Sequence, residues 1–409
     1  MADNASMSSL EAVDEYFDML IKSRFIEMFS YIDLNAQKSD WVPIGKVGTI
    51  LTGSTPKTNE PSYWNGNLKW IAPAELTSNS FIIEDTERKI TEEGRRSCSL
   101  NLLEPGVVLL SSRAPIGKVA IVGSEMYCNQ GFKNIKCGSD LNNVYLYVLL
   151  KNNTEYLNGL GRGATFKEIS AKIVENIRIP VPPIELQNQF VEFFKQVDKS
   201  KAVCKQIFQL FDDLVKSRFI EMFGDPVANR FCWPIGKMKA VAPAVQFSQE
   251  PMQEGNWLLN LDAIQSNSGE ILFKNKVSKN ELTGSIMSFG TGNVLYSKLR
   301  PYLNKVVVPN EPGYGTTELI PLLPNPELLN QTYFACLLRS DPFVSKFSSA
   351  VAGTKMPRVS MDTFWKFDVP LPTFDLQNEF ATFVKQVDKS KFEVIQSLTK
   401  LMESVKPSE

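Results

Sequence analysis

The sequence predicts an α/β protein in which two α/β domains are separated by two long antiparallel coiled-coil helices. An internal pseudo-two-fold axis would relate the two halves, in a circular arrangement of the chain. Three observations lead to this fold: segments that occur twice, a long stretch without proline or glycine, and two divergent regions rich in short β-type runs. A chain of 409 residues is long enough for two cores, because domains usually contain about 100 to 200 residues.

Two segments of the chain are repeated letter for letter. Residues 22–29 (KSRFIEMF) reappear as residues 216–223, and residues 195–201 (KQVDKSK) reappear as residues 385–391. The middle of the chain holds the whole repeat, whereas the C-terminal end holds its first part and the N-terminal end holds its last part. Together the two ends would rebuild the middle, so we expect a chain closed on itself with its termini close together.

The middle copy reads as one long helix. Residues 184–223 contain no proline or glycine; Pro182 and Pro183 precede them and Gly224 follows. Proline is tolerated at a helix start, and glycine is a common stop signal. At about 1.5 Å per residue, such a helix is a rod of roughly 60 Å.

Apolar residues in this helix recur at spacings of three and four, the heptad pattern of a seam for a partner helix. The C-terminal segment repeats the pattern, so we expect the two helices to pair, with Ser200 and Ser390 at equivalent seam positions. The predicted seam residues are Phe190, Phe193, Val197, Cys204, Ile207, Phe211, Leu214, Phe380, Phe383, Val387, Val394 and Leu401.

Two regions of similar size and divergent sequence lie between the helical segments. Each begins with the phrase PIGK, continues with short β-rich runs, and ends with a helical stretch. The β-rich runs include residues 107–111, 118–122, 293–297 and 305–308, and the helical stretches lie near residues 142–157 and 328–347. We divide the chain into a helical segment (9–29), a first domain (30–183), the central helix (184–224), a second domain (225–373) and a C-terminal helix (374–405).

Composition excludes several classes of function. The chain has no histidine, which removes the commonest general base and metal ligand, and its six cysteines form no C-x-x-C pair. We therefore expect no metal site, no disulfide framework and reduced, mostly buried thiols. Residues 1–10 lack a signal-peptide pattern and no apolar run is long enough to cross a bilayer, so we expect a cytoplasmic protein without a membrane partner. The net charge of −1 gives no global attraction to DNA.

Motifs for catalysis on this chain are missing, and we expect no catalytic residue. Adenine methyltransferases need an N/D-P-P-aromatic tetrad, but Pro182-Pro183 stands between valine and isoleucine. No Gly-Lys pair has the upstream glycine of a phosphate loop. Glu87-Arg88-Lys89 has no acidic partner at the spacing of a nuclease core, so a surface turn is the better interpretation.

The phrases of the first domain match a known family. They are TGSTP (52–56), YWNG (63–66), LKWI (68–71), SSRAPIG (111–117) and NQGF (129–132), with KSRFIEMFGDP (216–226) after the long helix. With these phrases the sequence resembles the specificity subunit of type I restriction-modification enzymes over almost the whole chain. The second domain lacks the TGSTP phrase, so its base preference does not follow from the likeness.

The resemblance implies a noncatalytic reader of double-stranded DNA. Two target-recognition domains would each read one half of a bipartite, asymmetric site, and the paired helices would set the spacing. The helices would also dock two methyltransferase subunits, through which restriction subunits join. No cofactor would be bound by this chain, while S-adenosylmethionine, ATP and Mg would be used by the partner subunits.

Polar and basic residues in β-rich turns and in two basic loops are the predicted DNA contacts, because such side chains pair with bases and phosphates. We expect Trp64 and Trp70 in the core. The predicted contacts are Thr55, Lys57, Lys69, Arg113, Lys118, Asn129, Gln130, Lys133, Arg162 and Lys167 in the first domain, and Ser297, Lys298, Arg300, Lys305, Lys355 and Arg358 in the second.

Two other classes of function stay open at this stage. A noncatalytic coiled-coil scaffold that bridges two protein-binding domains would explain the near-zero net charge. A nuclease or methyltransferase is the weaker alternative, because the motifs for either are missing. A scaffold would add no DNA sequence preference to a complex, whereas a specificity subunit would.

Overall fold

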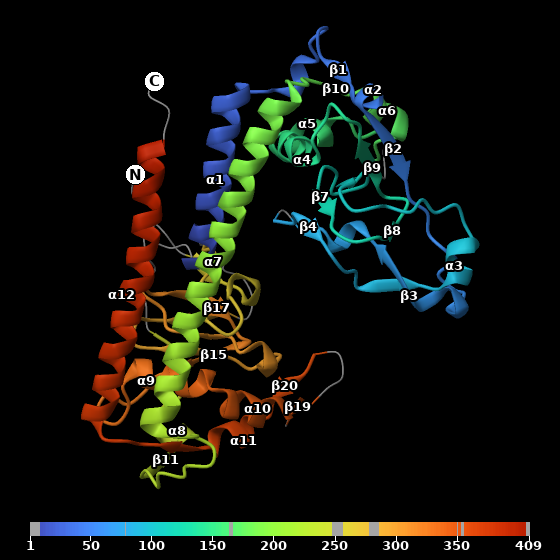
Figure 1. The fold of residues 1–409 in the computed structure, drawn as a ribbon. Coiled ribbons are helices and arrows are strands. Elements are labelled where there is room, and N and C mark those ends of the chain that lie inside the picture. Colours follow the sequence, from blue (N-terminus) through green and yellow to red (C-terminus); the bar gives the residue numbers. More distant parts are fainter. Residues whose placement is uncertain are drawn as a thin grey trace. The chain divides into compact units, whose positions relative to one another are not determined.

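The computed structural model describes residues 9–77, 79–162, 167–247, 257–277, 286–349, 351–352 and 356–405. The chain divides into two compact units (Figure 1). The first unit contains residues 17–200, and the second contains residues 201–405 with the segment up to Tyr16. Helix α7 (Ile184–Phe223) contributes its N-terminal part to the first unit and its C-terminal part to the second, and α1 (Ser9–Phe29) is likewise divided after Tyr16. The chain ends, expected to lie close together, fall outside the described residues.

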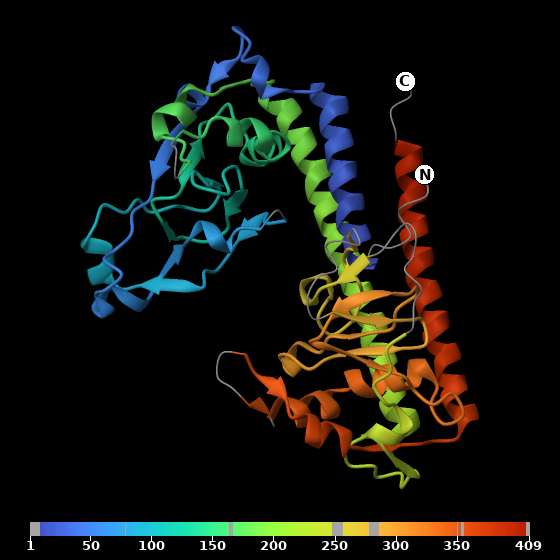
Figure 2. The same ribbon diagram turned by 180° about the vertical axis from the view of Figure 1, so that it is seen from behind.

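The first unit is a set of sheets packed against short helices (Figure 2). A five-stranded sheet has the order β2-β9-β6-β7-β4, a three-stranded sheet has the order β5-β3-β8, and β1 pairs with β10. The elements are α1 (Ser9–Phe29), η1 (Leu34–Ala36), β1 (Val42–Pro43), α2 (Ile44–Val47), β2 (Gly48–Thr52), η2 (Pro61–Tyr63), β3 (Trp64–Ile71), η3 (Pro73–Glu75), β4 (Ile82–Ile83), β5 (Arg88–Ile90), α3 (Glu92–Arg96), β6 (Val108–Leu110), β7 (Val119–Val122), β8 (Tyr127–Cys128), β9 (Lys133–Cys137), α4 (Asn143–Asn152), α5 (Thr154–Gly159), α6 (Ala171–Asn176) and β10 (Arg178–Ile179).

The second unit repeats this plan with shorter strands. Its sheets have the orders β13-β12-β17-β14 and β16-β15-β18, with the pairs β11-β21 and β19-β20. The elements are β11 (Ile235–Lys237), α8 (Met238–Val241), β12 (Trp257–Leu259), η4 (Leu261–Ala263), β13 (Asn275–Lys276), β14 (Ile286–Phe289), β15 (Val294–Ser297), η5 (Pro301–Leu303), β16 (Val306–Val307), β17 (Gly313–Thr316), β18 (Leu319–Leu322), α9 (Gln331–Arg339), α10 (Asp341–Ser349), β19 (Val351–Ala352), β20 (Arg358–Val359), α11 (Met361–Trp365), β21 (Asp368–Pro370) and α12 (Phe374–Val405).

The mixed α/β architecture and both long helices are confirmed. The four predicted β-rich runs contain β6, β7, β15 and β16, and the predicted helical stretches contain α4 with the start of α5 and α9 with most of α10. The shared PIGK phrase, however, does not mark equivalent positions. The amide of Ile44 donates to the carbonyl of Ile177, and the same bond in the second unit joins Met238 to Phe367. Ile44 therefore corresponds to Met238 and not to Ile235 of the second phrase.

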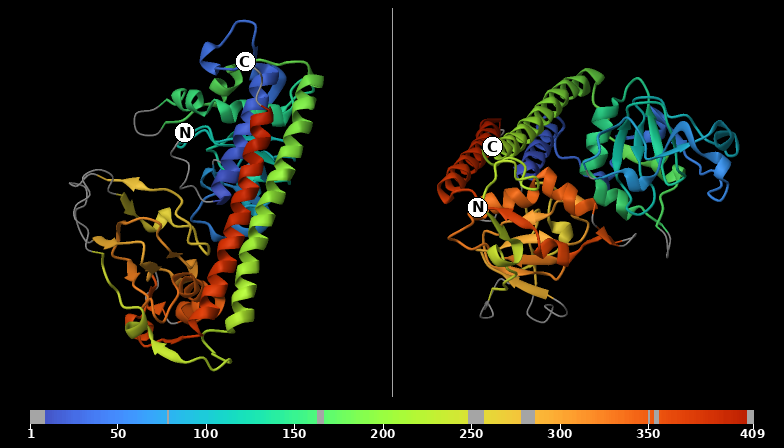
Figure 3. Two further views of the ribbon diagram at one scale, coloured as in Figure 1. Left: turned by 90° about the vertical axis from the view of Figure 1, so that its left-hand side faces the viewer. Right: turned by 90° about the horizontal axis from the view of Figure 1, so that it is seen from below.

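Both units hold their helices together with the same aromatic cluster. Helix α1 runs antiparallel to α7, and in the second unit α12 runs antiparallel to the other part of α7 (Figure 3). Ring centroids lie 4.7 to 5.6 Å apart in both clusters, at spacings where edge and stacked contacts are favourable. The clusters consist of Phe25, Phe29, Tyr145 and Phe190 in the first unit and Phe219, Phe223, Tyr333 and Phe380 in the second.

A buried glutamine joins each domain to its helix. Gln187 Nε2 donates to the carbonyls of Asp140 (2.9 Å) and Pro182 (2.7 Å), and its Oε1 accepts from the amide of Asn142 (2.8 Å). Gln377 makes the same three bonds in the second unit, to Leu328 (3.0 Å), Pro372 (2.9 Å) and Asn330 (2.8 Å). Both side chains are fully buried. The repeat therefore conserves its own polar contacts as well as its apolar packing.

The predicted seam residues differ in how deeply the structure buries them. Phe190, Val197, Cys204, Phe380 and Val387 are buried, as expected. Phe193, Ile207, Phe211, Phe383 and Val394 are half-buried, and the side chain of Leu401 lies outside the described residues. Leu214 is 47% exposed and is not a seam residue.

Of the two predicted seam serines, Ser390 is half-buried and Ser200 is not, and in both copies the next residue is a lysine that meets an acid of the partner helix. Ser200 is exposed and donates to the carbonyl of Gln196 within its own helix. The neighbouring Lys201 is only 16% exposed and pairs with Asp14 at 2.9 Å. In the other copy Lys391 is 12% exposed and pairs with Asp212. A lysine stem can fill an apolar seam while its ammonium group meets a carboxylate on the partner helix.

Replacing Gln377 with leucine should destabilise the protein strongly. The variant keeps the volume but leaves the Asn330 amide and the carbonyls of Leu328 and Pro372 without their partner. We expect the free energy of unfolding to fall by about 2 to 5 kcal/mol, measured by denaturant titration. Gln386→Leu, at an exposed position of the same helix, is the matched control and should change stability little. Equal stability of the two variants would contradict the structural role of Gln377.

Candidate nucleic-acid interface

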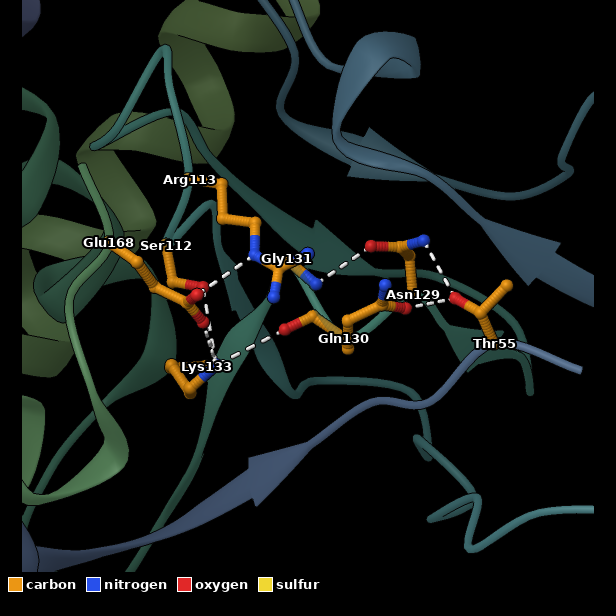
Figure 4. Close-up of polar contacts among 8 residues, drawn as sticks. All are labelled: Thr55, Ser112, Arg113, Asn129, Gln130, Gly131, Lys133 and Glu168. Carbon is orange, nitrogen blue, oxygen red and sulfur yellow. Dashed lines mark hydrogen bonds and ion pairs between the residues drawn. The ribbon is translucent and has the colours of Figure 1, made fainter. Parts of the chain in front are cut away.

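Five of the predicted contacts of the first domain meet in one polar cluster (Figure 4). Thr55 lies beyond the end of β2, Arg113 lies in the β6–β7 loop, and the others lie in the turn between β8 and β9 or at its end. The turn residues are Asn129, Gln130 and Lys133. Loops from three different strands thus bring together side chains that are far apart in sequence.

Hydrogen bonds fix the shape of the turn and of the loop that faces it. Asn129 Oδ1 accepts from the amide of Gly131 at 2.7 Å, which closes the turn on itself. Asn129 Nδ2 donates to Thr55 Oγ1 at 2.9 Å, and Thr55 Oγ1 also bonds Gln130 Oε1 (Figure 4). The amide nitrogen of Gln130 takes part in none of these bonds. This edge therefore presents polar side chains on a backbone that is already ordered.

Glu168, which the sequence analysis missed, binds two cations of the cluster. Its Oε2 accepts from Arg113 Nε at 2.9 Å, and its Oε1 pairs with Lys133 Nζ at 3.2 Å (Figure 4). Burial alone would raise the pKa of Glu168, but the bonds from Arg113 and Lys133 outweigh it and hold the pKa below its usual range. Lys133 is buried, and its Nζ also donates to the Gln130 carbonyl and to Ser112 Oγ.

The two tryptophans of this domain are core residues, as predicted, and they hold the loop that carries Thr55. Trp70 Nε1 donates to the Ser54 carbonyl and Trp64 Nε1 donates to the Lys57 carbonyl, both at 3.1 Å. Both rings are buried. The guanidinium of Arg88 lies 3.8 Å from the Trp64 ring centroid, a cation–π contact that covers the pair from outside.

Of the other predicted contacts of the first domain, Arg162 lies beside this cluster, because its backbone exchanges two hydrogen bonds with Glu168 (3.1 and 3.0 Å). Lys69 Nζ donates to the Glu84 carbonyl at 2.6 Å, and Lys118 Nζ donates to the Leu76 carbonyl. Both amines are therefore engaged in structural bonds. Lys57, Arg162 and Lys167 have exposed side chains.

The predicted contacts of the second domain are divided in the same way. Ser297 is buried and donates to the Leu299 carbonyl at 3.0 Å. Lys305 Nζ donates to the Leu261 carbonyl, and burial lowers its pKa. Arg300 is exposed, in a left-handed backbone conformation (φ 50°), and Lys298 is half-buried. Lys355 lies outside the described residues.

Arg358 pairs with Glu318, a second acidic residue that the sequence analysis missed. Arg358 Nε donates to Oε2 at 3.2 Å and Nη2 donates to Oε1 at 2.8 Å, a bidentate arrangement. The bond from Arg358 lowers the pKa of Glu318. In the sequence, Glu168 is the one acidic residue in the basic segment 162–174, and this position could have indicated that it pairs with a cation. The sequence around Glu318 contains no comparable signal.

The described residues contain no group of three or more histidine, cysteine, aspartate or glutamate side chains placed to hold a metal ion. All six cysteines are free thiols, of which Cys128 and Cys204 are buried and Cys232 is exposed. None of the helices in the described part of the chain combines the length and apolar composition needed to cross a bilayer.

Comparison with known proteins gives matches over most of the chain. The family model described as type I restriction modification DNA specificity domain matches residues 38–209 and 251–403. The specificity subunit of type I restriction enzyme MjaIX from Methanocaldococcus jannaschii is 35% identical over 219 residues, 51% of this chain and 50% of that protein. The specificity subunit of type I restriction enzyme EcoDI from Escherichia coli is 23% identical over 280 residues, 59% of this chain and 62% of that protein. The chain thus spans less than two thirds of either relative's length.

A solved structure supports the fold. It comes from work described as the structural basis of complex assembly and conformational transition of the type I R-M system, and it matches with a TM-score of 0.50 at 18% identity. The match covers 90% of this chain and 94% of that chain. Because the family model matches more than half of the 409 residues, this chain belongs to the type I restriction-modification DNA specificity family.

Proposed function

We propose that this chain is the DNA sequence-specificity subunit of a type I restriction-modification enzyme and performs no catalysis itself. The observation that supports this most strongly is a repeated backbone frame with different polar side chains. Both domains attach to their helices through the same glutamine and aromatic contacts. Asn129 and Gln130 of the first domain nevertheless correspond to Thr316 and Thr317 of the second, of which Thr317 is exposed. Two readers of unlike half-sites require this combination.

We assign the two readers to residues 30–183 and 225–373. A bipartite reader lies on duplex DNA with its two domains on two half-sites about one helical turn, roughly 10 base pairs, apart. Because the polar side chains of the two domains differ, the two half-sites should differ as well. A scaffold of two protein-binding domains would not need ordered polar turns at corresponding places, so that alternative is less favoured.

The paired helices would set the spacing and receive the partner subunits. These helices are α1 (9–29), α7 (184–223) and α12 (374–405), with exposed apolar side chains such as Val203, Leu210 and Phe392. We propose that two methyltransferase subunits dock there, and that restriction subunits join through them. S-adenosylmethionine, ATP and Mg would be bound by those subunits, in the cytoplasm.

The complex of this chain with its methyltransferase subunits should select one bipartite DNA sequence from a random library. We expect two unlike half-sites separated by a fixed number of unspecified base pairs, identified by sequencing the bound DNA. The methyltransferase subunits alone are the control and should give no such enrichment. A complex that binds DNA without any sequence preference would contradict the proposed function and favour a scaffold.

Deleting one heptad from both α7 and α12 should change the recognised gap. The deletion shortens the helices by about 10 Å, which corresponds to about three base pairs of B-DNA. We expect the methylated adenines in modified DNA to lie closer together by about that amount, or modification to stop. Lys199→Ala, an exposed change that keeps the helix length, should leave the gap as it is. An unchanged gap in the deletion variant would rule out the spacer role.

A further inference from the structure

Three backbone segments meet in the same way in both domains, and we call this meeting point the junction. In the first domain the Ile169 amide donates to the Ser112 carbonyl at 2.9 Å, and the Ser112 amide donates to the Gly131 carbonyl at 2.7 Å. In the second domain the Val359 amide donates to the Lys298 carbonyl at 2.9 Å, and the Lys298 amide donates to the Glu318 carbonyl at 3.0 Å. The junction is therefore residues 112–113, 131 and 168–169 in one domain and 298–299, 318 and 358–359 in the other.

The two junctions carry the same ion pair on different segments. In the first domain the arginine is Arg113 on the loop, and the acid is Glu168 on the last segment, which it meets in a backbone bridge. In the second domain the last segment carries Arg358, and Leu299 replaces the loop arginine in the corresponding bridge. The acid there is Glu318, at the position of Gly131. A pair inherited from the duplication would lie on equivalent residues in both domains. Because the two arginine–glutamate pairs lie on different segments of the junction, inheritance does not explain them.

Both pairs leave the same edge of the guanidinium free. Glu168 accepts from Nε of Arg113, and Glu318 accepts from Nε and one Nη hydrogen of Arg358. An arginine has five N–H donors, so the end formed by the two Nη atoms remains available in each case. Both arginine side chains are 47% exposed. A guanidinium end held in this way matches the O6 and N7 acceptors of guanine in the major groove.

The neighbouring cations are less suited to reading a base. Lys133 is buried beneath the first junction. Lys118 and Lys305 occupy corresponding places, and their amines donate to the carbonyls of Leu76 and Leu261. These lysines stabilise the loops around the junctions, and the arginines are the exposed cations whose orientation is fixed.

We infer that Arg113 and Arg358 each read one guanine, one in each half-site, and that Glu168 and Glu318 are positioning residues that hold the guanidinium groups. This inference rests on the proposed function. It predicts that each half-site contains a guanine contacted in the major groove. It also predicts that the guanine-reading arginine lies on different segments in the two domains. This difference contributes to the difference between the two half-sites.

The test is DNA selection from a random library by the complex of the full chain with its methyltransferase subunits. Arg113→Ala and Arg358→Ala should each lose the preference for guanine at one position of one half-site, and the two variants should affect opposite half-sites. We expect discrimination at that position to fall roughly 5- to 150-fold. Arg96→Ala, an exposed arginine on α3 away from the junction, is the matched control and should keep the full preference.

Conservative variants separate reading from charge and from folding. Arg113→Lys keeps the charge but lacks the planar guanidinium that donates two parallel hydrogen bonds. It should therefore lose the guanine preference as Arg113→Ala does. Glu168→Gln should reduce discrimination at the same position while affinity for unrelated DNA stays the same or rises, because a negative charge is removed. General destabilisation would not produce this split. Thermal unfolding of each variant complex identifies any that is misfolded.

The possible failures can be told apart. If the wild-type complex shows no sequence preference, the proposed function fails. If the wild-type complex is specific and the arginine variants keep its preference, or lose affinity equally at all positions, the inference alone is overturned. Loss in the same half-site for both arginines would also overturn it, because each domain would then not read its own guanine.

Discussion

The buried glutamines, Gln187 and Gln377, fix the orientation of each domain on its helix. The side chain of each glutamine bonds to its domain and to the segment that leads into the helix. Because each glutamine is itself a residue of the helix, these bonds join the domain to the helix. In a dry interior an unpaired amide or carbonyl costs about 1 to 3 kcal/mol, so a domain cannot turn on its helix without losing several such bonds. A reader that must contact particular base edges needs this fixed orientation.

The backbone around each junction is held by groups that do not depend on side-chain identity. At both junctions the three segments are joined by backbone amides and carbonyls. The side chains above them can therefore change while the backbone stays in place, as the exchange of Gly131 for Glu318 and of Glu168 for Arg358 shows. Under the proposed function, specificity could then diverge between two copies of one domain without loss of stability, because stability and reading would use different atoms.

Repeats and periodicity predicted most of the fold, because they report on long segments. The exact repeats located both long helices, and the β-rich runs located four strands of the two cores. The phase of the helix seam was not predictable, because Lys201 is polar in sequence but buries its stem and pairs with Asp14, far away in the chain. The match of two PIGK phrases was misleading, because the second domain enters its first strand at a different residue.

The site was predicted less completely, for a related reason. Sequence identifies cations, but whether a cation is free depends on what lies beside it in the fold. Lys118 and Lys305 bind carbonyls, and the buried Lys133 pairs with Glu168, but the positive charge of these lysines in the sequence does not reveal such partners. The acidic partners were missed because a carboxylate near DNA is unfavourable by charge alone. It becomes useful when it orients an arginine.

The same acidic partners separate specificity from affinity. Most of the binding energy of a DNA-binding protein comes from neutralising phosphates, and it is largely independent of sequence. Glu168 and Glu318 offset part of the positive charge at the junctions, and the whole chain has a net charge of −1. Under the proposed function, this chain alone would therefore bind phosphates weakly, and the methyltransferase subunits would supply most of the affinity. This chain would then bind unrelated DNA only weakly, because attraction to phosphates adds little binding energy at a wrong half-site.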